Sequence, residues 1–245
     1  MLKNRHLKRN HNHSLRNIFL KSCYIFTCIF LFSCSSKSTK EESFTKQATS
    51  KIEVKKTVKS NTKKIIFFGD SLTAGYGLND MNDAYPGLIQ QTIDSLKLGY
   101  TVINSGVSGE TSAGGKNRIN WVLNQKPDIF ILELGANDGL RGVSLKETRK
   151  NLQSIINIVK EKHPTAKIIL TGMQIPPNMG QEYTAEFKNI FPSLAKKNDI
   201  ALIPFLLENV GGIAELNQSD GIHPTKEGHV ILANNVWPIL KPFLK

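Results

Sequence analysis

Cysteine is scarce in this 245-residue sequence, and all of it lies close to the N-terminus. The three cysteines are Cys23, Cys28 and Cys34, so residues 35–245 contain none. A domain formed by those residues needs no disulfide, and its His, Asp and Glu residues show no zinc-binding spacing. Phosphate-binding and dinucleotide-binding glycine motifs are also absent. The sequence therefore predicts a domain that works without a metal and without a cofactor.

Residues 65–245 also lack an excess of charge of either sign. The whole chain has a net charge of +12, from 32 Lys and Arg against 20 Asp and Glu. Residues 1–33 hold six basic and no acidic residues, and residues 34–64 hold nine basic and three acidic residues. The 17 basic and 17 acidic residues that remain balance each other. Because a surface that attracts nucleic acid is basic, we expect no nucleic-acid partner for this region.

The first 34 residues resemble a bacterial lipoprotein signal. Basic residues precede the apolar stretch Ile18–Phe32, whose end reads Leu31-Phe32-Ser33-Cys34. In such signals a small residue precedes a cysteine that is lipidated and becomes the new N-terminus. An uncleaved anchor helix is the alternative, but a membrane span needs about 20 apolar residues. We expect a signal peptide at 1–33, lipid on Cys34, and an exported lipoprotein anchored to a membrane of the bacterial cell envelope.

Residues 34–63 have the composition of a tether. They are rich in Ser, Thr and Lys, and Phe44 is their only aromatic residue. No apolar period of two or 3.6 residues is sustained in them. We therefore expect a flexible spacer at 34–63 and one folded domain at 64–245, outside the cytoplasm.

Apolar runs alternate with helical patterns from Lys64 to the C-terminus. Short apolar runs predict buried strands at Lys64–Gly69, Tyr100–Ser105, Asp128–Leu134, Lys167–Gly172 and Ile200–Pro204. Helical periodicity predicts helices at Tyr85–Leu96, Ala113–Asn124, Leu145–His163, Glu182–Asn198 and Pro224–Phe243. The last helix is predicted to start at Pro224 because proline suits a first helical turn. This alternation predicts an α/β fold, a three-layer α/β/α sandwich with a five-stranded parallel sheet.

A serine follows the first predicted strand. In a parallel sheet, functional residues gather at the carboxyl ends of the strands. The strand Lys64–Gly69 leads directly through Asp70 to Ser71, so Ser71 is a candidate nucleophile. The alternative is that Ser71 only caps a following helix.

A candidate base and its acidic partner share one short segment late in the chain. Asp220 and His223 are three residues apart, just before the last predicted helix. One ring nitrogen of His223 can reach Ser71 while the other donates to Asp220. In the alternative, Asp220 caps the helix and His223 only packs beside it. The other candidate bases, His163 and His229, are better interpreted as surface or packing residues.

Two further loops supply candidate donors for a developing negative charge. Gly109 lies in a small-residue loop after the second predicted strand, where its backbone N–H can approach a substrate closely. Asn137 follows the third predicted strand, and its neutral amide can donate where a carboxylate would repel. The alternative for Asn137 is ordinary turn chemistry, which Asn-Asp-Gly favours.

These segments resemble the four blocks of the SGNH, or GDSL, hydrolases. The matching strings are GDSLTAGYGL, SGETSAGG, LELGANDGLRG and DGIHP, in that order. They are similar to the arylesterase and multifunctional thioesterase/lysophospholipase branch. The resemblance implies the flavodoxin-like SGNH hydrolase fold, a nucleophile at Ser71 and a His223–Asp220 pair. It also implies an oxyanion hole formed by the Ser71 N–H, the Gly109 N–H and the Asn137 side chain.

The substrate is less well defined by the sequence. Met173, Ile175 and Pro176 follow the fourth predicted strand and, with Leu140, could line an acyl groove. The alternative is that Met173 and Ile175 belong to the core. The resemblance favours aryl esters, acyl thioesters and lysophospholipids as substrates. Two other functions stay open: a carbohydrate O-deacetylase with the same catalytic residues, and a non-catalytic surface lipoprotein that binds lipid or glycan.

Overall fold

The structure is a computed structural model, and it describes residues 62–245. The predicted signal peptide, the lipidation site Cys34 and nearly all of the predicted tether lie outside these residues. Within residues 62–245, no helix has the length and apolarity that a membrane span requires.

Five parallel strands form one sheet in the order β2-β1-β3-β4-β5. They are β1 Lys63–Gly69, β2 Tyr100–Gly106, β3 Ile129–Leu132, β4 Lys167–Thr171 and β5 Ala201–Ile203. This confirms the predicted five-stranded parallel sheet. The third strand is shorter than predicted, because the chain turns away after Leu134 at Gly135, whose φ is +117°.

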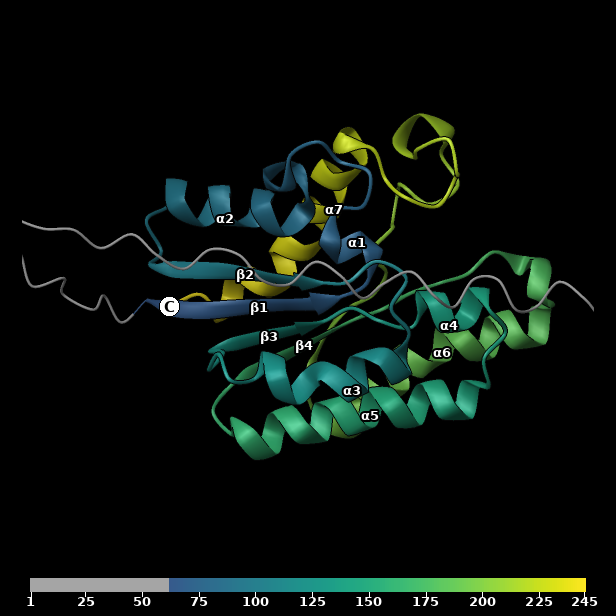
Figure 1. Cartoon of the computed structure of the whole chain (residues 1–245), viewed down its shortest axis with the longest axis horizontal. Helices are drawn as coiled ribbons and strands as arrows, with labels where there is room; N and C mark the ends of the chain where they lie inside the picture. The colour runs from purple at the N-terminus through teal and green to yellow at the C-terminus, as the bar shows by residue number, and fades with distance from the viewer. Residues whose placement is uncertain (1–61) are drawn as a thin grey trace, which may run out of the picture. The chain divides into compact units, whose positions relative to one another are not determined.

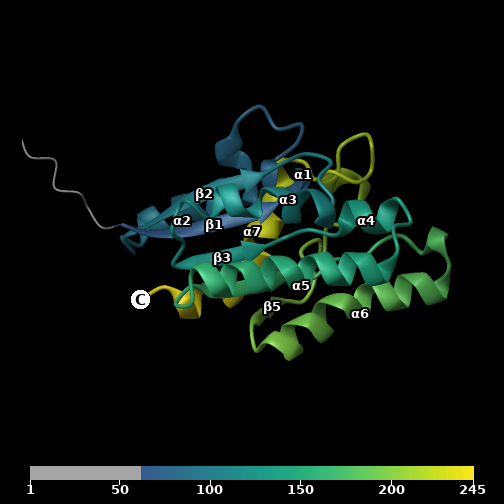
Figure 2. The same ribbon diagram turned by 60° about the horizontal axis from the view of Figure 1, so that its bottom comes forward.

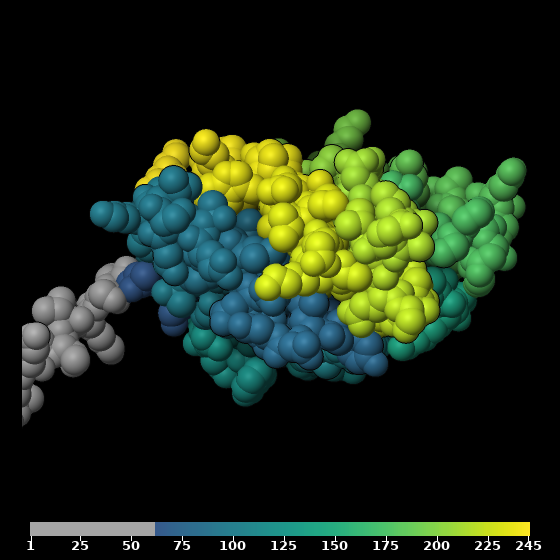
Figure 3. Space-filling model, turned by 90° about the horizontal axis from the view of Figure 1, so that it is seen from above, coloured from purple at the N-terminus to yellow at the C-terminus, as the bar shows by residue number. Residues whose placement is uncertain are grey.

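Helices cover both faces of the sheet. The long helices are α2 Tyr85–Ser95, α3 Ser112–Val122, α5 Leu145–Lys162, α6 Gln181–Asn198 and α7 Lys226–Leu240. Helices α2 and α7 lie on one face, and α3, α5 and α6 lie on the other (Figure 1). Figure 2 brings α5 and α6 forward, and Figure 3 shows the opposite face with α2 and α7. The three-layer sandwich is thus confirmed.

Short helical segments fill the connections. They are α1 Ser71–Ala74, α4 Ala136–Leu140 and the 3₁₀ turns η1 Met81–Asp83, η2 Pro177–Met179, η3 Ala214–Leu216 and η4 Lys241–Phe243. Neither α1 nor α4 is predicted from the sequence, because four or five residues are too few to show a helical period. Both of them lie in the connections that leave the carboxyl edge of the sheet, α1 after β1 and α4 after β3.

The last helix begins later than the predicted start at Pro224. Its N-cap is Thr225, whose hydroxyl accepts a hydrogen bond from the Gly228 N–H. Pro224 instead pairs with Asn217 in an isolated antiparallel bridge. The bridge closes the segment between them into a compact turn, and this turn carries Asp220 and His223.

The first strand is fixed from both sides. Ile65, Ile66, Phe67 and Phe68 have no exposed surface. The Phe67 ring packs edge-on against Tyr85 of α2 with the ring centroids 5.4 Å apart. Phe68 faces the other layer, where the Arg118 guanidinium of α3 lies 4.0 Å from its ring centroid. The residues that follow β1 are therefore attached to a strand that is packed on both faces.

Candidate active site

The end of β1 lies where the chain changes direction in the sheet. Strand β1 has β2 on one side and β3 on the other, so connections leave it in both directions. Such a switch point is where open α/β sheets place their ligand sites. Asp70 is the N-cap of α1, with its Oδ1 atom 3.0 Å from the Leu72 N–H. Ser71 is the first residue of the helix and not its cap.

Ser71, His223 and Asp220 form a continuous hydrogen-bonded chain. The His223 Nε2 atom lies 2.9 Å from the Ser71 Oγ atom, and its Nδ1 atom lies 2.7 Å from Asp220 Oδ2. A carboxylate at Nδ1 selects the tautomer in which Nδ1 carries the proton. The Nε2 lone pair then faces the serine hydroxyl, which is the arrangement that removes its proton.

In the alternative interpretation Asp220 caps the last helix, but the structure shows that it does not cap α7. Its Oδ1 atom accepts hydrogen bonds from the backbone N–H groups of Ile222 and His223, each at 3.0 Å. The hydrogen bond from the His223 ring, together with these backbone donors, lowers the pKa of Asp220 to about 2. Asp220 is therefore ionised at neutral pH, and its partial exposure to water also favours the charged form.

The turn that carries this pair is tied to the loop after Ser71. Gln218 Nε2 donates to the Tyr76 carbonyl at 2.7 Å and to the Pro224 carbonyl at 2.9 Å. The Tyr76 ring lies against the His223 ring, with their centroids 4.6 Å apart. These contacts fix the distance between two segments that are far apart in the sequence.

Ser71 and Gly109 both line the cavity. Neither backbone N–H has a hydrogen-bond partner in the part of the chain that the structure describes. Gly109 has a φ of +78°, a conformation that favours glycine, and its carbonyl accepts from Arg141 Nη2 at 3.1 Å. The residues that carry these two free donors line the same cavity as His223.

The amide of Asn137, the second residue of α4, is held at both of its polar atoms. Its Nδ2 atom donates to Asp70 Oδ2 and to the Glu110 carbonyl, each at 3.1 Å. Its Oδ1 atom accepts from Arg141 Nη2 at 3.3 Å. Acceptors on one side and a cation on the other leave only one orientation for the amide. The carboxyl group of Asp70 is therefore one of the two acceptors that hold the amide nitrogen of Asn137.

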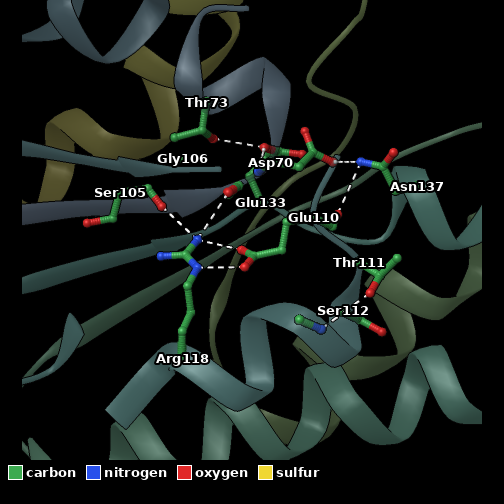
Figure 4. A network of polar contacts seen from close by, with 12 residues as sticks. Asp70, Thr73, Ser105, Gly106, Glu110, Thr111, Ser112, Arg118, Glu133 and Asn137 are labelled. Carbon is green, nitrogen blue, oxygen red and sulfur yellow. Dashed lines mark hydrogen bonds and ion pairs between the residues drawn. The ribbon is translucent and has the colours of Figure 1, made fainter. Parts of the chain in front are cut away.

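An arginine holds the loop that carries Glu110. Arg118 Nε donates to Glu110 Oε1 at 2.6 Å, and Arg118 Nη2 donates to the Ser105 carbonyl at 2.8 Å and the Gly69 carbonyl at 3.3 Å. Figure 4 shows this arginine joining the ends of β1 and β2 to the loop. The Glu110 carbonyl that accepts from Asn137 is thereby fixed.

A cavity of about 610 Å³ opens above Ser71 and His223. Apolar side chains dominate its wall, and the four predicted groove residues Leu140, Met173, Ile175 and Pro176 are all among them. Met173 and Ile175 are also part of the buried core, so both interpretations of them hold together. Sequence reasoning missed these other lining residues: Tyr76, Arg141, Phe205, Leu207 and Ile222.

The two other histidines among residues 62–245 do not line this cavity. His163 Nε2 contacts the Leu123 carbonyl at 2.9 Å, and His229 is buried, with its Nδ1 atom accepting from the Tyr85 N–H. Burial lowers the pKa of His229 to about 4, so it is neutral in the folded protein at neutral pH. Residues 62–245 contain no group of three or more His, Cys, Asp or Glu side chains placed to bind a metal ion.

The hydrogen-bonded chain runs from a serine through a histidine to a carboxylate. Together with free N–H donors and an apolar cavity, it is the arrangement of a serine hydrolase. The GDSL-like lipase/acylhydrolase family model matches residues 67–231. The chain therefore belongs to this family, and it is an ester hydrolase of the esterase, thioesterase and lysophospholipase type.

Similar proteins include enzymes from two well-known bacteria. Esterase TesA of Pseudomonas aeruginosa is 39% identical over 189 residues, which are 77% of this chain and 92% of that protein. Thioesterase 1/protease 1/lysophospholipase L1 of Escherichia coli is 35% identical over 181 residues, 74% of this chain and 84% of that protein. A crystal structure of TesA superimposes with a TM-score of 0.71 at 39% identity, covering 74% of this chain and all of that chain.

Proposed function

We propose that this enzyme hydrolyses esters of apolar acyl groups by two-step acyl transfer from Ser71. The observation that carries the proposal is the hydrogen-bonded chain from Ser71 through His223 to Asp220 at the floor of an apolar cavity. His223 Nε2 takes the hydroxyl proton as Ser71 Oγ attacks the carbonyl carbon. The tetrahedral intermediate then collapses, and His223 returns the proton to the leaving alcohol or thiol. Water attacks the acyl-enzyme in the same way and restores Ser71.

The negative charge that develops on the carbonyl oxygen needs donors that are already in place. The Ser71 and Gly109 N–H groups are free to supply two. Both Nδ2 hydrogens of Asn137 are donated, to Asp70 and to the Glu110 carbonyl, so on this proposal one of them turns to the oxyanion as the third donor. Each such donor contributes about 3–4 kcal/mol to lowering the barrier. Asp220 stays ionised and stabilises the imidazolium that forms on His223.

The cavity favours a substrate with an acyl chain. Leu140, Met173, Ile175 and Pro176 form an apolar wall that an acetyl group would leave largely uncovered. Lysophospholipids, aryl esters and acyl thioesters of medium chain length are therefore the proposed substrates. A carbohydrate O-deacetylase would need polar sugar-binding groups at this wall. The binding-only alternative is not retained, because the chain is an ester hydrolase.

A substrate panel with the full-length protein tests this proposal. p-Nitrophenyl esters of increasing chain length, a lysophospholipid, an acyl thioester and an acetylated glycan are compared by kcat/KM. We expect medium-chain esters to exceed acetyl esters, and Ser71→Ala to abolish turnover while urea unfolding stays unchanged. Turnover in Ser71→Ala would remove the nucleophile assignment, and a preference for acetylated glycan would favour the deacetylase.

We propose further that lipid on Cys34 anchors the enzyme to a membrane of the bacterial cell envelope. The support is the sequence Leu31-Phe32-Ser33-Cys34 after an apolar stretch, followed by a Ser-, Thr- and Lys-rich segment. Expression in bacteria with labelled fatty acid should label the wild type and the matched control Cys28→Ser. Labelling of Cys34→Ser, or its recovery with membranes, would contradict the anchor.

A further inference from the structure

A cation and a hydroxyl come close together in the wall of the cavity above Ser71. Among the described residues that line this cavity, Arg141 is the only Lys or Arg. Ser108 lines it as well, and both residues are exposed. Arg141 Nη2 donates to the carbonyl of Gly109, the residue after Ser108, so the guanidinium lies beside the loop that carries the serine. Arg141 and Ser108 are called the polar corner below.

Most of the hydrogen-bond donors in the polar corner are free. The two contacts of Arg141, to the Gly109 carbonyl at 3.1 Å and to Asn137 Oδ1 at 3.3 Å, both use Nη2. Its Nε and Nη1 atoms have no partner within residues 62–245, and none of the ion pairs in that range includes Arg141. The hydroxyl and the backbone N–H of Ser108 have no partner there either. The guanidinium is therefore held in place while most of its donors stay available to a ligand.

These donors suit a phosphate group. A guanidinium presents its N–H groups in a plane that matches two phosphate oxygens, and the serine hydroxyl and N–H add further donors. Asp70 is the only carboxyl group among the described residues of the cavity wall. It is 1% exposed, and its oxygens already accept from the Leu72 N–H and from Asn137 Nδ2. An anion in the polar corner would thus meet a cation without facing an exposed carboxylate of the same wall.

The place of the polar corner limits how the phosphate is linked to the reacting ester. Arg141 Nη2 contacts Gly109 and Asn137, and these residues supply two of the three proposed oxyanion donors. A phosphate bound to Arg141 would therefore lie close to the carbonyl that reacts with Ser71. In a lysophospholipid, only a glycerol unit separates the acyl ester from the phosphate. In an acyl phosphopantetheine, a much longer chain separates the thioester from the phosphate, so the glycerol linkage fits the polar corner better.

We propose that Arg141 and Ser108 form a subsite for a phosphate group on the substrate, and that this subsite directs the enzyme to acyl glycerol phosphates. The inference rests on the proposed hydrolysis of acyl esters at Ser71 and adds a substrate preference to it. Phosphate is bound in the ground state and in the transition state alike. Its contribution should therefore appear mainly in KM, whereas the contacts of Arg141 to the oxyanion region should appear in kcat.

Two substrates that differ only in the phosphate test the proposal. Octanoyl glycerol phosphate and monooctanoylglycerol are compared with the full-length protein, and the ratio of their kcat/KM values measures the phosphate preference. Arg141→Ala should lower this ratio by about tenfold or more through a higher KM for the phosphate substrate, because a charge-assisted contact is lost. Any loss in kcat should be equal for the two substrates. Ser108→Ala removes one neutral hydrogen bond and should lower the ratio by about threefold.

Arg149→Ala is the matched control, because Arg149 belongs to α5 and does not line the cavity. Its ratio should be that of the wild type. An equal loss for both substrates in Arg141→Ala would overturn the proposal. If the wild type hydrolyses neither octanoyl ester, the proposed hydrolysis of acyl esters fails instead, so the two failures are distinguishable.

A second pair of substrates tests the source of the phosphate. Octanoyl phosphopantetheine and octanoyl pantetheine differ by a phosphate far from the thioester, so Arg141→Ala should change their ratio by less than about threefold. A tenfold change confined to this pair would overturn the assignment to acyl glycerol phosphates.

Salt gives an independent measurement on the glycerol pair. Added NaCl should lower the phosphate preference of the wild type more than that of Arg141→Ala, because salt screens an exposed cation. The same salt dependence in both proteins would contradict a role for the Arg141 charge.

Discussion

Two regions of the molecule place a carboxyl group close to Ser71, and the surroundings of the two carboxyl groups differ. Asp220 lies on the turn before α7 with its side chain 40% exposed, whereas Asp70 at the end of β1 is 1% exposed. Donors from His223 and Ile222 lower the pKa of Asp220 to about 2, and burial raises the pKa of Asp70 to about 6. In the exposed acid, hydration and hydrogen-bond donors both favour the ionised form. The buried acid lies beside a second buried carboxyl, that of Glu133, whose Oε2 atom accepts from the Asp70 N–H.

Removing the charge of the exposed acid should have the largest effect. In Asp220→Asn the amide can donate to His223, which favours the tautomer with its proton on Nε2 and blocks proton removal from Ser71. We expect kcat to fall by about 10⁴-fold. Steady-state kinetics give the value, and circular dichroism checks the fold. A loss in kcat smaller than about tenfold would show that Asp220 does not control the tautomer of His223.

Removing the donor that the buried acid orients should have the next largest effect. Asn137→Ala should lower kcat by about 10²- to 10³-fold and change KM little, since the donor acts mainly on the transition state. The matched control is Asn151→Ala, a hydrogen-bonded and buried asparagine that does not line the cavity. A change in KM alone would contradict the role of Asn137.

A third experiment extends the comparison to stability. The Nδ1 atom of His229 accepts from the Tyr85 N–H. Burial lowers the pKa of His229 from 6.5 to about 4. As pH falls, His229 is therefore protonated in the unfolded chain before it is protonated in the folded protein. Its contribution to the free energy of unfolding is fully present above pH 6.5 and is lost as pH falls toward 4. The shift corresponds to about 3 kcal/mol.

Urea unfolding of the wild type and His229→Gln measures this effect. The stability difference between the two proteins should shrink by about 3 kcal/mol from pH 7 to pH 4. Asp70 acts in the opposite direction, because its raised pKa favours the folded state at low pH, but it is present in both proteins and cancels. A pH-independent difference would mean that His229 titrates normally.

The smallest effect is expected at the exposed edge of the oxyanion region. Arg141→Ala removes hydrogen bonds to the Gly109 carbonyl and Asn137 Oδ1. The net contribution of a hydrogen bond is about 1 kcal/mol. A rise of that size in the activation barrier would lower kcat by about fivefold. Asn137 keeps its contacts to Asp70 and Glu110 in this variant. A loss as large as that of Asn137→Ala would transfer the main positioning role to Arg141.

The fold and the proposed catalytic residues can be predicted because each is encoded in a continuous short segment. Runs such as Ile65–Phe68 predict buried strands, and the block that holds Asp220 and His223 brings base and acid together within one turn. Ser71 and the His223 pair are found separately, and the structure brings them within hydrogen-bonding distance.

The supporting contacts are not predicted because they join distant segments. Glu133 is visible in the sequence only as a carboxylate at the end of an apolar run, and nothing local indicates Asp70 as its neighbour. Arg141 lies one helical turn after Asn137, a spacing that could have indicated a shared face, but α4 is too short to be recognised as a helix. The start of the last helix was misplaced because the Asn217–Pro224 bridge is a long-range constraint.

The position of the chain's last residue has a practical use. The Lys245 carbonyl accepts from the Lys63 side chain at the start of β1. Figure 1 shows the C-terminus at this end of the strand, whereas the cavity is lined by Asp70 and Ser71 beyond its other end. A resin linker or a fusion partner joined at Lys245 would leave the mouth of the cavity open. The same proximity makes residues 63–245 a suitable frame for circular permutation, with Lys245 joined to Lys63 and new termini in an exposed loop.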